Sequence, residues 1–148
     1  MIRQHVHESQ IILIVEDSED DFDATKRAFN KANLYNTIDH VYSGEEAIAY
    51  LQSPHVILPG IILLDLNMPG LDGRKTLDVI KQDKKLKKIP VVVLTTSNDE
   101  RDIKACYDLG ANTYIQKPVD FDGLIKAMTR LKEYWFEIAI LPKGDNDE

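Results

Sequence analysis

Cysteine is nearly absent from this chain of 148 residues, and basic residues are outnumbered by acidic ones, 18 to 25. A single cysteine, Cys106, cannot form an internal disulfide and indicates a reducing compartment, so we expect a cytoplasmic protein. The net charge of −7 argues against binding to nucleic acid, which requires clustered cations. No apolar run approaches the roughly 20 residues of a membrane-spanning helix. We therefore expect neither nucleic acid nor a membrane as a partner.

The histidine, lysine and glycine residues do not form the motif of a metal, nucleic-acid or nucleotide site either. The histidines lack the paired spacing of metal ligands; they are His5, His7, His40 and His55. The one basic run, Lys81 to Lys88, contains Asp83, and we interpret it as a solvated helix end. The sequence also lacks a glycine-rich loop of the kind that cradles nucleotide phosphates.

Short apolar runs alternate with helical patterns along the chain, which predicts an α/β fold. The expected strands are Ile11–Val15, Ile38–Val41, Ile61–Leu64, Val91–Leu94 and Thr113–Ile115. The expected helices are Asp20–Ala32, Gly44–Leu51, Arg74–Asp83, Arg101–Leu109 and Phe121 to about Ile140. Continuous apolar strands predict a five-stranded parallel sheet, doubly wound, with helices on both faces. We expect a flexible segment at 1–9, one domain at 10–141 with an extended last helix, and an acidic tail at 142–148.

Polar residues stand where the apolar runs end; they are Glu16, Asp17, Asp65, Thr95 and Lys117. In a doubly wound sheet the carboxyl ends of the strands meet at one edge, where ligands bind. Carboxylates gathered there repel one another unless a divalent cation lies between them, and Mg²⁺, or Mn²⁺ in its place, suits this arrangement. We predict Asp17, Asp65 and the backbone carbonyl of Asn67 as ligands, with Glu16 acting through water.

This set of residues also predicts a reaction. A carboxylate beside Mg²⁺ can attack a phosphoryl group, so we predict an acyl phosphate on Asp65. The ammonium group of Lys117 would pair with the phosphoryl oxygens. The Thr95 hydroxyl would donate to another of these oxygens and act as a switch, because this contact exists only when phosphate is present.

The motifs resemble the receiver domain of two-component response regulators, from about Ile11 to Leu131. They are Glu16-Asp17, Asp65 followed by Asn67-Met68-Pro69-Gly70 and Asp72-Gly73, Leu94-Thr95, Gly110-Ala111 and Lys117-Pro118. The resemblance implies that a sensor histidine kinase phosphorylates Asp65 and that phosphorylation changes the conformation and protein binding. It also implies that Tyr114 is an aromatic residue that moves between outward and inward positions, and that the Lys117–Pro118 bond is cis. The only chemistry implied is self-catalysed phosphotransfer and dephosphorylation, so we do not expect an enzyme.

The last helix carries two apolar stripes. One consists of Leu124, Met128, Leu131, Trp135 and Ile138, and the other of Phe121, Ile125, Phe136 and Ile140. One stripe is enough to cover a sheet, so a second one predicts a surface for another copy or a partner; the alternative is that both are core. We predict that this surface includes Phe121, Ile125, Tyr134, Trp135, Phe136 and Ile140. Only about eight residues follow the helix, so we expect output through binding.

A narrower resemblance concerns three segments. Tyr134–Glu137 with Ile140–Pro142, Val15–Ser18 and Val93–Ser97 resemble stand-alone regulators that accept phosphate from bacterial phytochrome histidine kinases. This resemblance implies a bacteriophytochrome as the kinase partner and a homodimer through the last strand and helix. A phosphorelay intermediate or adaptor that serves another kinase stays open, as does a receiver that acts without phosphate. A phosphohydrolase would need a second acid just after Asp65, where Leu66-Asn67 has none.

Overall fold

The computed structural model describes residues 10–66 and 73–138. Its centre is a sheet of five parallel strands in the order β2-β1-β3-β4-β5. The strands are β1 (Ile12–Val15), β2 (Ile38–Val41), β3 (Ile61–Asp65), β4 (Val91–Thr95) and β5 (Thr113–Gln116). The predicted sheet is confirmed, with strand ends that differ by one residue or not at all. The winding direction reverses between β1 and β3, which creates the crevice where such sheets bind ligands.

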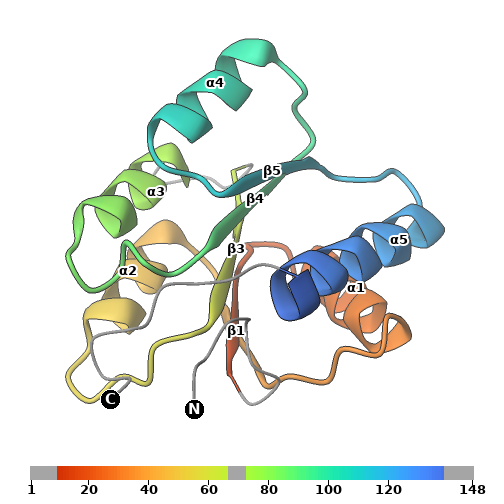
Figure 1. Cartoon of the computed structure of the whole chain (residues 1–148), viewed down its shortest axis with the longest axis horizontal. Coiled ribbons are helices and arrows are strands. Elements are labelled where there is room, and N and C mark those ends of the chain that lie inside the picture. Colours follow the sequence, from red (N-terminus) through yellow and green to blue (C-terminus); the bar gives the residue numbers. More distant parts are fainter. Residues whose placement is uncertain (1–9, 67–72, 139–148) are drawn as a thin grey trace.

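Helices cover both faces of the sheet, as the continuous apolar strands predict (Figure 1). They are α1 (Glu19–Lys31), α2 (Gly44–Gln52), α3 (Gly73–Gln82), α4 (Glu100–Asp108) and α5 (Phe121–Lys132). The helices α1 and α5 pack together on one face, while α2, α3 and α4 lie on the other. Alternate residues of β1, β3 and β4 point into these two layers, and every residue of the three strands is buried.

Side chains and glycine set the helix ends. The Ser18, Ser43 and Asp99 side chains accept hydrogen bonds from backbone N–H groups in the first turn of α1, α2 and α4, respectively. The predicted start of α2 at Gly44 is therefore confirmed, and α4 begins one residue before the predicted Arg101. Gly110 follows α4 with a φ angle of +106°, a conformation that side chains other than glycine rarely adopt.

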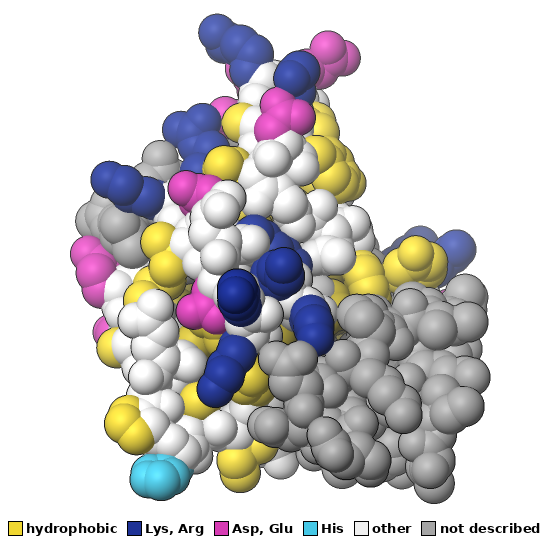
Figure 2. All heavy atoms as spheres, turned by 60° about the vertical axis from the view of Figure 1, so that its left-hand side comes forward, with side chains coloured by type: hydrophobic (Ala, Val, Ile, Leu, Met, Phe, Trp, Pro, Cys, Tyr) yellow, Lys and Arg dark blue, Asp and Glu magenta, His cyan; other side chains and the backbone are white. Residues whose placement is uncertain are grey.

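Lysine side chains gather on the face formed by α2, α3 and α4, which Figure 2 brings forward. Four residues of the basic run, Lys84, Lys85, Lys87 and Lys88, are exposed as predicted. Lys81 is half-buried instead, and its Nζ donates to the carbonyl oxygens of Lys87 (3.0 Å) and Ile89 (2.7 Å) and to Asn112 Oδ1 (2.9 Å). Although three oxygens accept from it, burial lowers the pKa of Lys81 to about 8. Lys81 thus links the end of α3 to the segments that precede β4 and β5.

Replacing Gly110 by alanine should lower the free energy of unfolding by about 2 kcal/mol, because a positive φ is strained for any residue with a Cβ atom. The added Cβ would also lie 2.9 Å from Lys81 Cγ, so the lysine would have to shift. Chemical denaturation measures the loss. An unchanged midpoint would show that the turn relaxes without cost.

The last helix departs from the prediction at its end. The α-helix stops at Lys132 and continues as a π-helix, η1 (Glu133–Ile138). Trp135 is 6% exposed and belongs to the core between the sheet and α1 and α5, so little of its surface is accessible to a partner, and its place at an interface stays a prediction. Phe121, Ile125 and Phe136 are half-buried against the same core.

Tyr134 is 51% exposed, in edge-to-face contact with the buried Trp135 ring. Trp135→Ala should therefore lower the free energy of unfolding by about 3–5 kcal/mol, as for other buried large aromatic residues. Tyr134→Ala, the matched control on the next residue, should cost about 1 kcal/mol or less, mainly from the lost ring contact. Equal losses would contradict the burial of Trp135.

Three further expectations have different outcomes. Ile140 and both predicted terminal segments lie outside the described residues, so the domain limits at residues 10 and 141 stay predictions. The described residues contain no cis peptide bond, so the expected cis bond at Lys117–Pro118 is wrong. The two forms of a bond before proline differ by only about 0.5–1 kcal/mol, so the surroundings decide between them.

Within the described ranges, none of the helices combines the length and apolar character that crossing a membrane would need.

Candidate functional site

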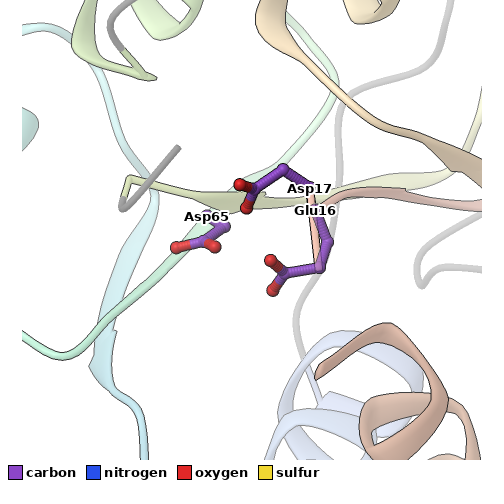
Figure 3. A group of neighbouring side chains, drawn as sticks. All are labelled: Glu16, Asp17 and Asp65. Atoms are coloured by element: carbon purple, nitrogen blue, oxygen red, sulfur yellow. The ribbon is translucent and has the colours of Figure 1, made fainter. Parts of the chain in front are cut away.

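Three carboxylates meet at the carboxyl ends of β1 and β3. Glu16 and Asp17 follow β1, and Asp65 is the last residue of β3. Because β1 and β3 are paired neighbours with Val15 opposite Leu64, the residues that follow lie side by side. One oxygen from each carboxylate lies within 4.8 Å of the others, and Figure 3 shows the three groups facing a common space. Glu16 and Asp65 are buried, whereas Asp17 is exposed to solvent.

Lys117 brings a positive charge to this group from the end of β5. Its Nζ lies 3.0 Å from Glu16 Oε1 and 3.3 Å from Asp65 Oδ2. Its backbone N–H donates to the Thr95 carbonyl at 2.7 Å, which ties the loop after β5 to the end of β4. The lysine side chain is only 17% exposed, so solvent screens these contacts little.

Burial and charge act together on the titration of the site. Burial, a hydrogen bond with Asp65 and the negative charge of Asp65 together raise the pKa of Glu16 to about 8, although Lys117 opposes this. Burial by itself lowers the pKa of Lys117, but the charges of Asp65 and Glu16 leave it above its ordinary value. The two buried carboxylates thus repel each other, and one ammonium group does not fully compensate them.

The sequence did not single out Asp21, which also contacts Lys117. Its Oδ2 lies 3.3 Å from Lys117 Nζ, and its backbone N–H donates to the capping side chain of Ser18. An acid in the first turn of a helix is ordinary, since it complements the helix dipole. No sequence signal could therefore distinguish Asp21 from Glu19 or Asp20.

Thr95 ends β4 beside this group and is buried, with its Oγ1 accepting a hydrogen bond from the Ser97 N–H at 3.2 Å. Tyr114 on β5 is half-buried, and its hydroxyl donates to the Ser97 carbonyl at 2.9 Å. The two residues predicted as a switch thus both contact Ser97. A displacement of Thr95 would therefore move Ser97 and change its hydrogen bond with Tyr114.

The acidic group fits a divalent cation. Its donors are hard carboxylate oxygens, and the exposed side of Asp17 leaves room for the water ligands that Mg²⁺ retains. Asp17 and Asp65 can bind the ion directly, with Glu16 close enough to act through a water ligand. The third predicted ligand, Asn67, lies outside the described residues. The fold and the donor set together are those of a divalent-metal site of a receiver domain.

The chain belongs to the response regulator receiver domain family, which matches residues 12–129. Response regulator Rcp1 of Synechocystis sp. is 41% identical over 144 residues, which cover 90% of this chain and 93% of the relative. The predicted resemblance to the receiver family is thereby confirmed.

Two solved structures extend the likeness to phytochrome response regulators. The phosphorylated cyanobacterial phytochrome response regulator RcpA is 39% identical, with a TM-score of 0.84, and the match covers 91% of this chain and 99% of RcpA. The Mn²⁺-bound form of Rcp1 is 38% identical, with a TM-score of 0.82, over 90% of this chain and 99% of that protein. A Mn²⁺ ion in so similar a protein agrees with the predicted Mg²⁺ or Mn²⁺ cofactor.

Proposed function

We propose that this response regulator accepts a phosphoryl group on Asp65 from the phosphohistidine of a sensor histidine kinase. The observation that carries the proposal is the placement of Lys117 Nζ 3.3 Å from Asp65 Oδ2 beside the metal-binding carboxylates. A nucleophile, a cation for the phosphoryl oxygens and a divalent-metal site then lie within one small volume. Phosphoryl transfer depends on this kind of positioning and charge compensation.

In the proposed reaction an Asp65 carboxylate oxygen attacks the phosphorus atom. The new P–O bond replaces the P–N bond of the phosphohistidine, and the imidazole leaves with the bonding electrons. A divalent ion held by Asp17 and Asp65 supplies positive charge against the charge on the transferred group. Lys117 pairs with a phosphoryl oxygen, and Thr95 turns its hydroxyl toward another. This movement changes the Ser97 contact of Tyr114 and signals phosphorylation to the surface of β5.

A phytochrome histidine kinase is the proposed donor, since the chain is similar to phytochrome response regulators along nearly its whole length. A hollow beside Lys117 offers access for its phosphohistidine between α1 and the start of α5. The hollow is lined by Ala24, Thr25, Pro118 and Val119, among other residues, and Val119 is fully exposed. The proposed place of action is the cytoplasm, a reducing compartment that agrees with the free cysteine Cys106.

Phosphotransfer from purified, autophosphorylated histidine kinases tests the proposal. The wild-type chain should take up radiolabel within the shortest incubation from a phytochrome kinase, and only after long incubation from unrelated kinases. Uptake from every kinase at one slow rate would contradict the phytochrome assignment and leave the receiver chemistry intact. Absence of label from all donors would contradict the proposed function.

Self-association through β5 and α5 is part of the proposal. The half-buried residues Phe121, Ile125 and Phe136, with exposed Tyr134, offer apolar area along α5 and η1. We expect light scattering after size exclusion to give the mass of a dimer. Tyr134→Asp should shift it to the monomer at a cost in stability of about 1 kcal/mol or less, because Tyr134 is exposed and loses only its contact with the Trp135 ring. An unchanged mass would place the interface elsewhere.

A further inference from the structure

An aromatic stack lies next to the acidic group, on the edge strand β2. The His40 ring is sandwiched between Phe22 of α1 and Tyr42, with centroid distances of 3.8 Å and 4.0 Å and interplanar angles of 11° and 30°. The Tyr42 hydroxyl donates to Glu19 Oε1 at 2.5 Å, which holds the outer ring. The stack therefore fixes the plane and the position of the histidine ring.

The ring reaches the metal site through the backbone. His40 Nε2 lies 2.7 Å from the carbonyl oxygen of Glu16. A carbonyl can only accept, so Nε2 carries the proton and donates. The β1–β2 ladder ends at the pair Val15 and Val41, and the Glu16 N–H still donates to the Val41 carbonyl at 3.0 Å. Glu16 is thus held at both ends by β2, at its N–H by the backbone and at its carbonyl by the His40 ring.

We infer that His40 is a positioning residue of the metal site. The carbonyl that it holds belongs to the peptide between Glu16 and Asp17, and the orientation of this peptide plane sets the directions in which both carboxylates project. Glu16 and Asp17 must point to the same space as Asp65, although they are neighbours in sequence (Figure 3). Free rotation of the peptide would turn Asp17 away. The inference rests on the proposed function, because it assigns His40 to the metal site that serves Asp65.

Two substitutions separate the hydrogen bond from the stack. His40→Phe keeps an aromatic ring between Phe22 and Tyr42 but has no donor, whereas His40→Gln loses the ring and keeps an N–H near the position of Nε2. A purely structural role predicts that metal affinity follows stability in both variants. A positioning role predicts that affinity follows the donor.

The experiment is a Mn²⁺ titration of the full chain, read from the electron paramagnetic resonance signal of free Mn²⁺, with thermal unfolding measured in parallel. We expect His40→Phe to weaken Mn²⁺ binding by about tenfold, in the range of groups that orient metal ligands. His40→Gln should weaken binding less than His40→Phe does, whatever its stability. His40→Leu, which also lacks a donor, replaces His40→Phe if that variant does not fold.

Two results would overturn the inference: wild-type affinity in the variant without a donor, or a loss in His40→Gln at least as large as in that variant. Failure of the proposed function looks different. In that case the wild-type chain itself would bind no Mn²⁺, or would not be phosphorylated on Asp65. Tight Mn²⁺ binding by the wild type and by both His40 variants would overturn only the role of His40.

Discussion

Asp65→Asn is expected to reduce phosphorylation by acetyl phosphate in the presence of Mg²⁺ to an undetectable level. An amide has nearly the shape of a carboxylate but is a very weak nucleophile, so the variant should fold while its chemistry is lost. Asp65 is buried beside Glu16, and removing one of two repelling charges should keep the free energy of unfolding at or above that of the wild type. Intact-protein mass spectrometry measures the added phosphoryl group.

A matched control separates this effect from a general loss of negative charge. Asp108→Asn changes an exposed carboxylate at the end of α4 that pairs with Lys104. It should be phosphorylated like the wild type. Persistent, alkali-labile phosphorylation of Asp65→Asn would mean that another residue accepts the phosphoryl group, and the site described above would not be the phosphoacceptor site.

Asp17→Asn is expected to weaken Mg²⁺ and Mn²⁺ binding by at least about tenfold, because it replaces a charged oxygen ligand by a neutral one. Phosphorylation at low Mg²⁺ concentration should fall in parallel, and excess Mg²⁺ should restore part of it. Asp17 is exposed, so thermal unfolding should not change. Isothermal titration calorimetry measures the affinity.

Asp20→Asn is the control for Asp17→Asn. Asp20 is an exposed acid in the first turn of α1, three positions along the chain, and its substitution changes the net charge equally. It should leave metal affinity nearly unchanged. If both variants weakened binding to the same extent, the metal would be held by the general negative field of this edge of the sheet, and ligation by Asp17 would be refuted.

Much of this architecture could be predicted because its causes are local. Apolar runs such as Ile61–Leu64 are too short for helices, and their continuous character predicted strands buried on both faces. The gathering of the acids after β1 and β3 could be predicted as well, because parallel strands end at one edge of the sheet. Caps such as Ser43 depend on residues within one helical turn, so the predicted helix start was confirmed.

Other features depend on contacts between distant parts of the chain. Lys81 belongs to a basic run, but its surroundings are carbonyl oxygens beyond α3 and on the approach to β4, which no local pattern reveals. Trp135 was predicted on the same apolar stripe as Met128 and Leu131 and also at an interface. Tertiary packing places it in the core beside these two residues, with 6% of its surface exposed.

The order of residues along the chain was sufficient to establish the parallel sheet, its two helical layers and the edge where Glu16, Asp17, Asp65 and Lys117 gather. Hydrophobic periodicity and strand direction are properties of short segments. They determine the sheet, its helical layers and the edge at which the strands end. Tertiary packing alone decided that Asp21 shares Lys117 with the acidic group and that His40 holds the Glu16 carbonyl. Such contacts join α1, β2 and β5 across many residues, and their geometry exists only after the sheet has been assembled.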